Sequence, residues 1–159
     1  MKFLKSMLLT VALGLAAVHT QAQTPTQTSL AQQQEVIDLF FAAARTGNNE
    51  VISEFLKHSF PVDVRNKDGY TPLMMAAYYG HQDIVTNLLN KGADRCLRDN
   101  KGNTALMGAI FKLEWSIAKQ LNKVDCDANA KQTGQKTVAE FAKVIGQDKK
   151  LQQLIEESK

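Results

Sequence analysis

The sequence predicts an all-α solenoid of stacked helix pairs joined by hairpin loops, with about four repeats including the two caps. Three threonines recur every 33 residues, in the segments DGYTPL, KGNTAL and GQKTVA: Thr71, Thr104 and Thr137. Three glycines share one phase of the same period: Gly47, Gly80 and Gly146. A third phase agrees, because residues 94–98 lie 33 positions before the similar residues 127–131. Each unit is therefore expected to bury its apolar face against the next one.

Residues 1–22 have the layout of a secretory signal peptide. Lys2 and Lys5 precede an apolar run at residues 7–18, and a polar stretch ends at Ala22. An apolar helix of that length reaches roughly 18 Å, well short of a bilayer core of about 30 Å. We therefore expect cleavage after Ala22, no membrane insertion afterwards, and an oxidising location, the bacterial periplasm.

Residues 23–34 are rich in Gln and Thr and have almost no apolar content. Such a segment cannot bury enough surface to offset the entropy of ordering it. The sequence thus predicts a disordered linker at 23–34, followed by a single repeat domain at 35–159.

The unit after Gly69 predicts a helix pair. Thr71 is a capping residue and Pro72 suits the first helical turn, so the first helix begins there and ends at Gly80. A second helix is expected over residues 81–90, with one apolar stripe at helical spacing: Ile84, Val85, Leu88 and Leu89. A charged stretch then leads to the next unit as a hairpin.

The unit GYTPLMMAAYYGHQDIVTNLLNKGADRCLRDNKG resembles an ankyrin repeat in its period and its Thr-Pro-Leu start. The first unit has Asp38-Leu39-Phe40 in place of that start, as a capping repeat would. Leu113 stands where the other units have glycine. That turn is therefore either built differently, or Leu113 is strained in the left-handed conformation by about 1 to 2 kcal/mol.

The resemblance implies a non-enzymatic scaffold that binds a protein partner. Exported bacterial ankyrin proteins further imply a role in oxidative-stress defence linked to catalase, or as an immunity or inhibitor protein for a secreted toxin or enzyme. The formal charge of +3 falls to +1 without Lys2 and Lys5, so charge predicts no nucleic-acid partner. We expect a monomer.

Catalytic and metal-binding motifs are missing from the sequence. It contains no HExxH, no G-x-S-x-G, no phosphate-binding G-x-x-x-x-G-K-[ST] and no G-x-G-x-x-G. His58 and His81 fall at helix ends, and Asp125-Cys126-Asp127 lacks the glycine and distal glutamate of a calcium loop. We therefore expect no catalytic residue, no metal and no cofactor.

Cys96 and Cys126 lie at the start of consecutive hairpins. Three alternatives stay open: a disulfide, two buried thiols, or a redox or metal function. The disulfide would close about 31 residues and stabilise the fold by roughly 3 to 4 kcal/mol. Arg95 and Arg98 keep a cysteine-based redox factor open, since cations lower a thiol pKa.

Partner binding is expected on the concave face formed by the hairpin tips and the outward side of each first helix. Tyrosine and arginine are frequent anchors of protein interfaces. The candidate binding residues are Arg45, Tyr70, Met75, Tyr78, Tyr79, Asn103, Phe111 and Lys112. Each aromatic residue among them has an alternative role, which is to cover a neighbouring repeat. Trp115 is either a second anchor or a packing residue.

Overall fold

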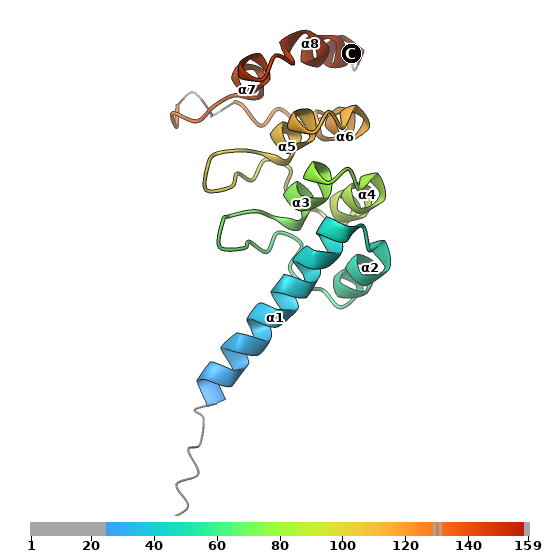
Figure 1. The fold of residues 1–159 in the computed structure, drawn as a ribbon, viewed down its shortest axis with the longest axis vertical. Helices are drawn as coiled ribbons and strands as arrows, with labels where there is room; N and C mark the ends of the chain where they lie inside the picture. The colour runs from blue at the N-terminus through green and yellow to red at the C-terminus, as the bar shows by residue number, and fades with distance from the viewer. Residues whose placement is uncertain (1–24, 129, 131, 158–159) are drawn as a thin grey trace, which may run out of the picture.

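The structure, a computed structural model, describes residues 25–128, 130 and 132–157, and in this part of the chain eight helices form four stacked pairs (Figure 1). In chain order the pairs are α1 (Pro25–Thr46) with α2 (Asn49–Lys57), α3 (Pro72–Tyr78) with α4 (Gln82–Asn90), α5 (Ala105–Phe111) with α6 (Trp115–Leu121), and α7 (Val138–Val144) with α8 (Asp148–Glu156). The inner helices α1, α3, α5 and α7 pack on one another, and α2, α4 and α6 form an outer row. Hairpin loops project from one side (Figure 1). The predicted all-α solenoid is confirmed.

The three threonines of the repeat have equivalent surroundings. Each hydroxyl oxygen caps an inner helix by accepting a hydrogen bond from the backbone three residues later, at Met74 N, Met107 N and Glu140 N over 3.3, 3.3 and 3.1 Å. In α7 the Glu140 carboxylate accepts a hydrogen bond in return from Thr137 N at 2.9 Å. These bonds satisfy amide hydrogens that the helix itself leaves unpaired.

A left-handed residue follows each inner helix and turns the chain back into the outer helix. Its φ is 81° at Gly47, 78° at Gly80, 62° at Leu113 and 71° at Gly146. Leu113 therefore adopts the left-handed conformation of the glycines. Of the two alternatives, a differently built turn or a strained leucine, the strained leucine is present. Ser59 also has a positive φ, 58°, at the position where the next repeat has Gly92.

The core lies between the inner and outer helices. The fully buried side chains of α3 and α4 include Leu73, Ala76, Ala77, Ile84, Val85 and Leu88. At the first repeat, Phe40, Phe55 and Phe60 pack with ring centroids 5.0 Å apart. Trp115 lies partly buried against this core.

The expected linker differs from the structure. Its described part, residues 25–34, is the first half of α1, and no helix begins at Asp38. Residues 29–34 are exposed, so this part of α1 is helical without burying surface, whereas the sequence predicted disorder for it. The physical reason is cooperativity: a helix anchored by Phe40, Ala43 and Ala44 extends without a new nucleation step.

The expected signal peptide, residues 1–22, lies outside the described residues, as do residues 23 and 24. In the part of the chain that the structure covers, no helix is both long and apolar enough to cross a membrane.

Candidate functional site

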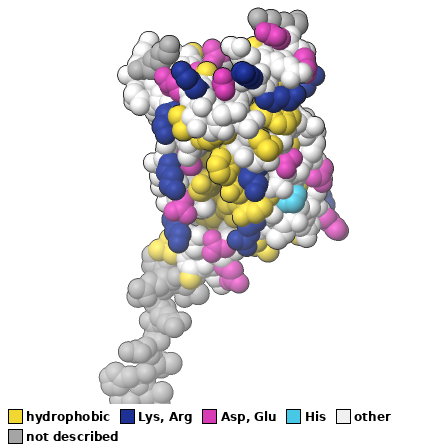
Figure 2. Space-filling view, turned by 45° about the horizontal axis from the view of Figure 1, so that its top comes forward, with side chains coloured by type: hydrophobic (Ala, Val, Ile, Leu, Met, Phe, Trp, Pro, Cys, Tyr) yellow, Lys and Arg dark blue, Asp and Glu magenta, His cyan; other side chains and the backbone are white. Residues whose placement is uncertain are grey.

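The inner helices line up one side chain per repeat on the face opposite the outer row. We call this surface, with the adjoining hairpin tips, the inner-helix face. Positions 33 residues apart form its central stripe: Arg45, Tyr78, Phe111 and Val144. Phe111 is 53% exposed and Val144 is 78% exposed. Figure 2 shows an apolar patch along the middle of this face, with Lys and Arg side chains beside it.

A groove of about 350 Å³ opens on this face between α3, α5 and α7. Four of the residues chosen from the sequence line it: Tyr70, Tyr78, Asn103 and Phe111. The other lining residues are Met74, Asp99, Lys101, Thr104, Met107, Gly108 and Phe141. Half of the eight expected binding residues therefore converge on one hollow.

Aromatic rings build one wall of the groove. The rings of Tyr78 and Phe111 stack with centroids 6.2 Å apart and planes 14° apart. Tyr79 packs edge-on against Tyr78 at 5.2 Å. Lys112 Nζ lies 5.2 Å from the centroid of the Tyr78 ring, a cation–π contact. Tyr79 and Lys112 thus act as neighbours of the groove rather than lining it.

Tyr70 and Asp99 join the groove to the hairpin loops. Asp99 is buried, and its carboxylate accepts hydrogen bonds from Lys101 N and Asn103 N, both at 2.8 Å. Partial burial, and then the charges of Asp99 and Asp68, raise the pKa of the Tyr70 phenol above its ordinary value. Tyr70 therefore stays a neutral hydroxyl that hydrogen-bonds to Asp99.

The remaining expected residues have other surroundings. Arg45 is exposed on α1, and its carbonyl oxygen lies 2.9 Å from His81 Nε2. Met75 is half-buried and packs against the core. At the hairpin tips, Asn100 Nδ2 donates to Lys67 O at 3.0 Å, so this side chain holds two repeats together.

Sequence reasoning missed Asp99, Gly108, Phe141 and Val144 as parts of this face. The repeat register contained the signal for three of them, because Gly108 and Phe141 follow Met75 by one and two periods, and Val144 follows Phe111 by one. Asp99 gave no such signal, since its role depends on a hydrogen bond from another repeat.

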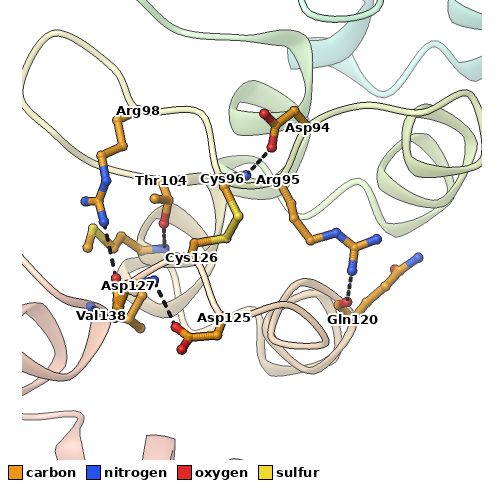
Figure 3. Close-up of a disulfide and its surroundings, with 11 residues drawn as sticks. Asp94, Arg95, Cys96, Arg98, Thr104, Gln120, Asp125, Cys126, Asp127 and Val138 are labelled. Atoms are coloured by element: carbon orange, nitrogen blue, oxygen red, sulfur yellow. Dashed lines mark hydrogen bonds and ion pairs between the residues drawn. A yellow bond between two sulfur atoms is a disulfide. The ribbon is translucent and has the colours of Figure 1, made fainter. Parts of the chain in front are cut away.

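The two cysteines are joined in a disulfide, which is one of the three alternatives left open by the sequence (Figure 3). Their Cα atoms are 5.0 Å apart. The loops have a local spacing of 31 residues, because Asp94 Oδ1 accepts from Cys96 N and Asp125 Oδ1 accepts from Asp127 N in matching turns. The two cysteines are 30 residues apart, so they lie only one residue away from equivalent positions in the two loops.

The arginines beside Cys96 contact other groups (Figure 3). Arg98 pairs with Asp127 at 3.2 Å and donates to Gly102 O at 2.6 Å, while Arg95 donates to Gln120 O at 3.4 Å. Arg98 thus links the loops of the two cysteines, and Arg95 links the loop of Cys96 to α6. This arrangement favours a structural role for the cysteines over redox chemistry.

The histidines also make structural contacts. His58 Nε2 lies 2.9 Å from Glu54 Oε1, and His81 bonds to the α1 carbonyl already described. Among the described residues, no group of three or more His, Cys, Asp or Glu side chains is placed to hold a metal ion.

Comparison with known proteins places the repeats in a family. The family model "Ankyrin repeats (3 copies)" matches residues 39–132. The chain is 38% identical over 80 residues to the potassium channel AKT2/3 of Arabidopsis thaliana and 44% identical over 73 residues to protein HOS4 of Saccharomyces cerevisiae. It is 34% identical over 90 residues to the ankyrin repeat-containing protein P1E11.10 of Schizosaccharomyces pombe.

These matches cover 50%, 44% and 56% of this chain, but only 10%, 7% and 42% of the respective relatives. The chain thus spans less than half the length of each. The three relatives are a potassium channel and two proteins that are not named as channels, and each matches this chain over 73 to 90 residues. The similarity therefore concerns the repeats and not the activity of a whole protein.

Proposed function

Because this chain belongs to the ankyrin-repeat family, whose repeats are protein–protein interaction modules, we propose that it is a non-catalytic scaffold that binds one protein partner on its inner-helix face. The observation that carries the proposal is the convergence of Tyr70, Tyr78, Asn103 and Phe111 on one groove. Exposed aromatic side chains combine a large apolar area with few rotatable bonds, which suits an interface anchor.

The stack also supplies the rigidity that such a face needs. Neighbouring repeats are tied by Asn100 to Lys67 O in the loops and by Asn87 Nδ2 to Asn49 Oδ1 at 2.9 Å in the outer helices. An anchor held in place before binding loses little entropy on binding.

The proposal includes export to the periplasm. Two observations support it: the signal-like layout of residues 1–22 and the bond between Cys96 and Cys126. Disulfides persist in oxidising compartments and are rare where thiols are kept reduced. Catalase-linked stress defence and inhibition of a secreted toxin or enzyme remain the two settings that the family resemblance implies.

Affinity capture with the purified protein tests the proposal. The bait is incubated with extract of the exported fraction of the producing cell, and the bound proteins are identified by mass spectrometry. We expect Tyr78→Ala with Tyr79→Ala to weaken capture of a specific protein by more than about 1 kcal/mol while the thermal midpoint stays nearly unchanged. Fractionation of the producing cell tests the location.

A matched control changes two exposed outer-helix residues, Ser116→Ala with Lys119→Ala, and should retain capture. Equal capture by all three proteins would contradict binding on the inner-helix face. Detection of the protein in the cytosol with residues 1–22 intact would contradict export.

A further inference from the structure

We propose that the groove floored by Gly108 receives an apolar side chain from an acidic segment of the partner, whose carboxylates pair with Lys101 and Lys112. This inference rests on the proposed function and names the chemistry of the partner. Its basis is the shape of the groove, the direction of the apolar stripe and the local balance of charge.

Gly108 makes the groove deep enough for a side chain. It lies on α5 with φ outside the left-handed region, and a Cβ atom built there would lie 3.9 Å from Tyr78 Cβ, an ordinary contact. Backbone strain therefore does not require glycine at this position. The absence of a side chain leaves room between Tyr78, Phe111 and Phe141.

The size of the groove fits a side chain better than a large ligand. Its volume of about 350 Å³ is near the lower end of the roughly 300 to 1,000 Å³ typical of ligand pockets. The polar groups at its edge, Asp99 and Asn103, bond to each other through Asn103 Nδ2 at 3.1 Å. Because these two side chains already satisfy each other, an apolar group can enter the groove without leaving either of them unpaired.

The stripe gives the direction of the bound segment. Tyr78, Phe111 and Val144 repeat along the stack on α3, α5 and α7. Two steps between packed helices span roughly 16 to 20 Å. An extended peptide of about six residues crosses this distance.

The charge around the groove favours an acidic partner. Lys101 lines it, Lys112 lies over the Tyr78 ring, and Arg45 stands at the end of the stripe; all three are exposed. Of the acidic groups nearby, Asp99 is buried with its oxygens bonded, and Asp68 is exposed at the adjoining loop. Glu140 is exposed on α7 beside Phe141, and its carboxylate accepts a hydrogen bond from Thr137 N. Exposed cations thus outnumber exposed carboxylates here, and opposite charge on the partner would steer association.

Selection of peptides from a random display library tests both parts of the inference. The bait is the protein produced from its full-length gene, and the probes are peptides of about twelve residues, long enough to cross the stripe with flanking charges. We expect enriched peptides with net negative charge and at least one aromatic or large aliphatic residue. Their binding should weaken as salt is added.

Three variants locate the binding. Gly108→Leu fills the groove and should lower binding of the enriched peptides by at least about tenfold. Ser116→Leu adds the same side chain on the outer helix α6 and should leave binding unchanged. Lys101→Glu with Lys112→Glu should select peptides of neutral or positive charge, whereas Lys119→Glu on α6 should still select acidic ones.

The outcomes separate the two proposals. Neutral or basic peptides that lose binding to Gly108→Leu would overturn the acidic partner while leaving the binding face intact. Enrichment that is the same for Gly108→Leu, or no enrichment at all, would overturn the groove as the site of an acidic segment. The proposed function is overturned separately, by unchanged capture of the protein partner with Tyr78→Ala and Tyr79→Ala. Binding of a second copy of the chain, detected as a dimer by sedimentation that Gly108→Leu abolishes, would overturn the acidic segment as occupant. Each folded variant is checked by its thermal midpoint.

Discussion

The second repeat and the last repeat are held in the stack by different means. In the second repeat, α4 buries Ile84, Val85 and Leu88 completely. In the last repeat, α8 buries only Leu151 and Leu154, and Ile155 is 38% exposed. Both repeats have a threonine cap, so local helix signals do not explain the difference. The last repeat has no neighbour beyond it among the described residues and therefore less apolar surface to bury.

Cross-links between loops accompany the smaller core at this end. The disulfide joins the hairpin before α5 to the loop before α7 (Figure 3). Directly beside it, Asp127 pairs with Arg98 and accepts from Val138 N, the first residue of α7, at 2.6 Å. The hairpin loops of the second and third repeats are joined by hydrogen bonds, such as Asn100 N to Asp68 O at 3.1 Å. At the last repeat, a disulfide and an ion pair thus add stability where less apolar surface is buried.

Deleting the same side chain from both cores gives the largest expected effect. Leu88→Ala should lower the free energy of unfolding by about 4 kcal/mol, because a fully buried leucine leaves a cavity lined by neighbours on both sides. Leu154→Ala should cost only about 2 kcal/mol, since the last repeat relaxes more easily. Urea unfolding measures both, and equal losses would contradict the difference between the repeats.

Removing the disulfide should cost nearly as much as the central cavity. The bridge closes a separation of 30 residues, and Cys96→Ser with Cys126→Ser should destabilise by about 3 kcal/mol. The last repeat should also become the first site of proteolysis. Wild-type protein kept under a reducing agent is the matched sample and should lose the same amount. A loss below about 1 kcal/mol would show that packing alone retains the last repeat.

Asp127 allows the ionic link to be measured separately. Asp127→Asn removes the ion pair with Arg98 and should cost about 1 to 2 kcal/mol, because the Arg98 side chain is only 10% exposed and the Asp127 side chain 23%. Asp127→Ala should cost more, because Val138 N then loses its acceptor as well. Glu54→Gln is the control: it changes only exposed contacts, with Lys57 and His58, and its effect on unfolding should be near zero.

The smallest expected effect is a gain in stability at the turn between α5 and α6. Leu113→Gly should stabilise by about 0.5 to 1 kcal/mol, because the φ of 62° suits glycine and the leucine side chain is exposed. Ser59→Gly should gain a similar or smaller amount for the same reason. Lys112→Gly, at an ordinary φ of −89°, should instead lower the thermal midpoint.

Much of the inner-helix face followed from residue spacing alone. Tyr78 and Phe111 share one repeat position, so their exposure on one stripe was predictable once the period was known. Extending that register would also have found Val144 and Phe141. The tie between Tyr70 and Asp99 was not predictable, because it depends on how one hairpin lies against the next.

The sequence by itself determined the repeat, its threonine caps and its glycine turns, since these depend on backbone geometry within a few residues. It also determined which helix faces are apolar, through their periodicity. Only the tertiary structure decided that Cys96 meets Cys126, because the matching turns of these two loops lie 31 residues apart and not the 33 of the repeat period. It likewise decided that residues 25–34 continue α1 and that Gly108 opens a groove, since both depend on what the neighbouring elements leave uncovered.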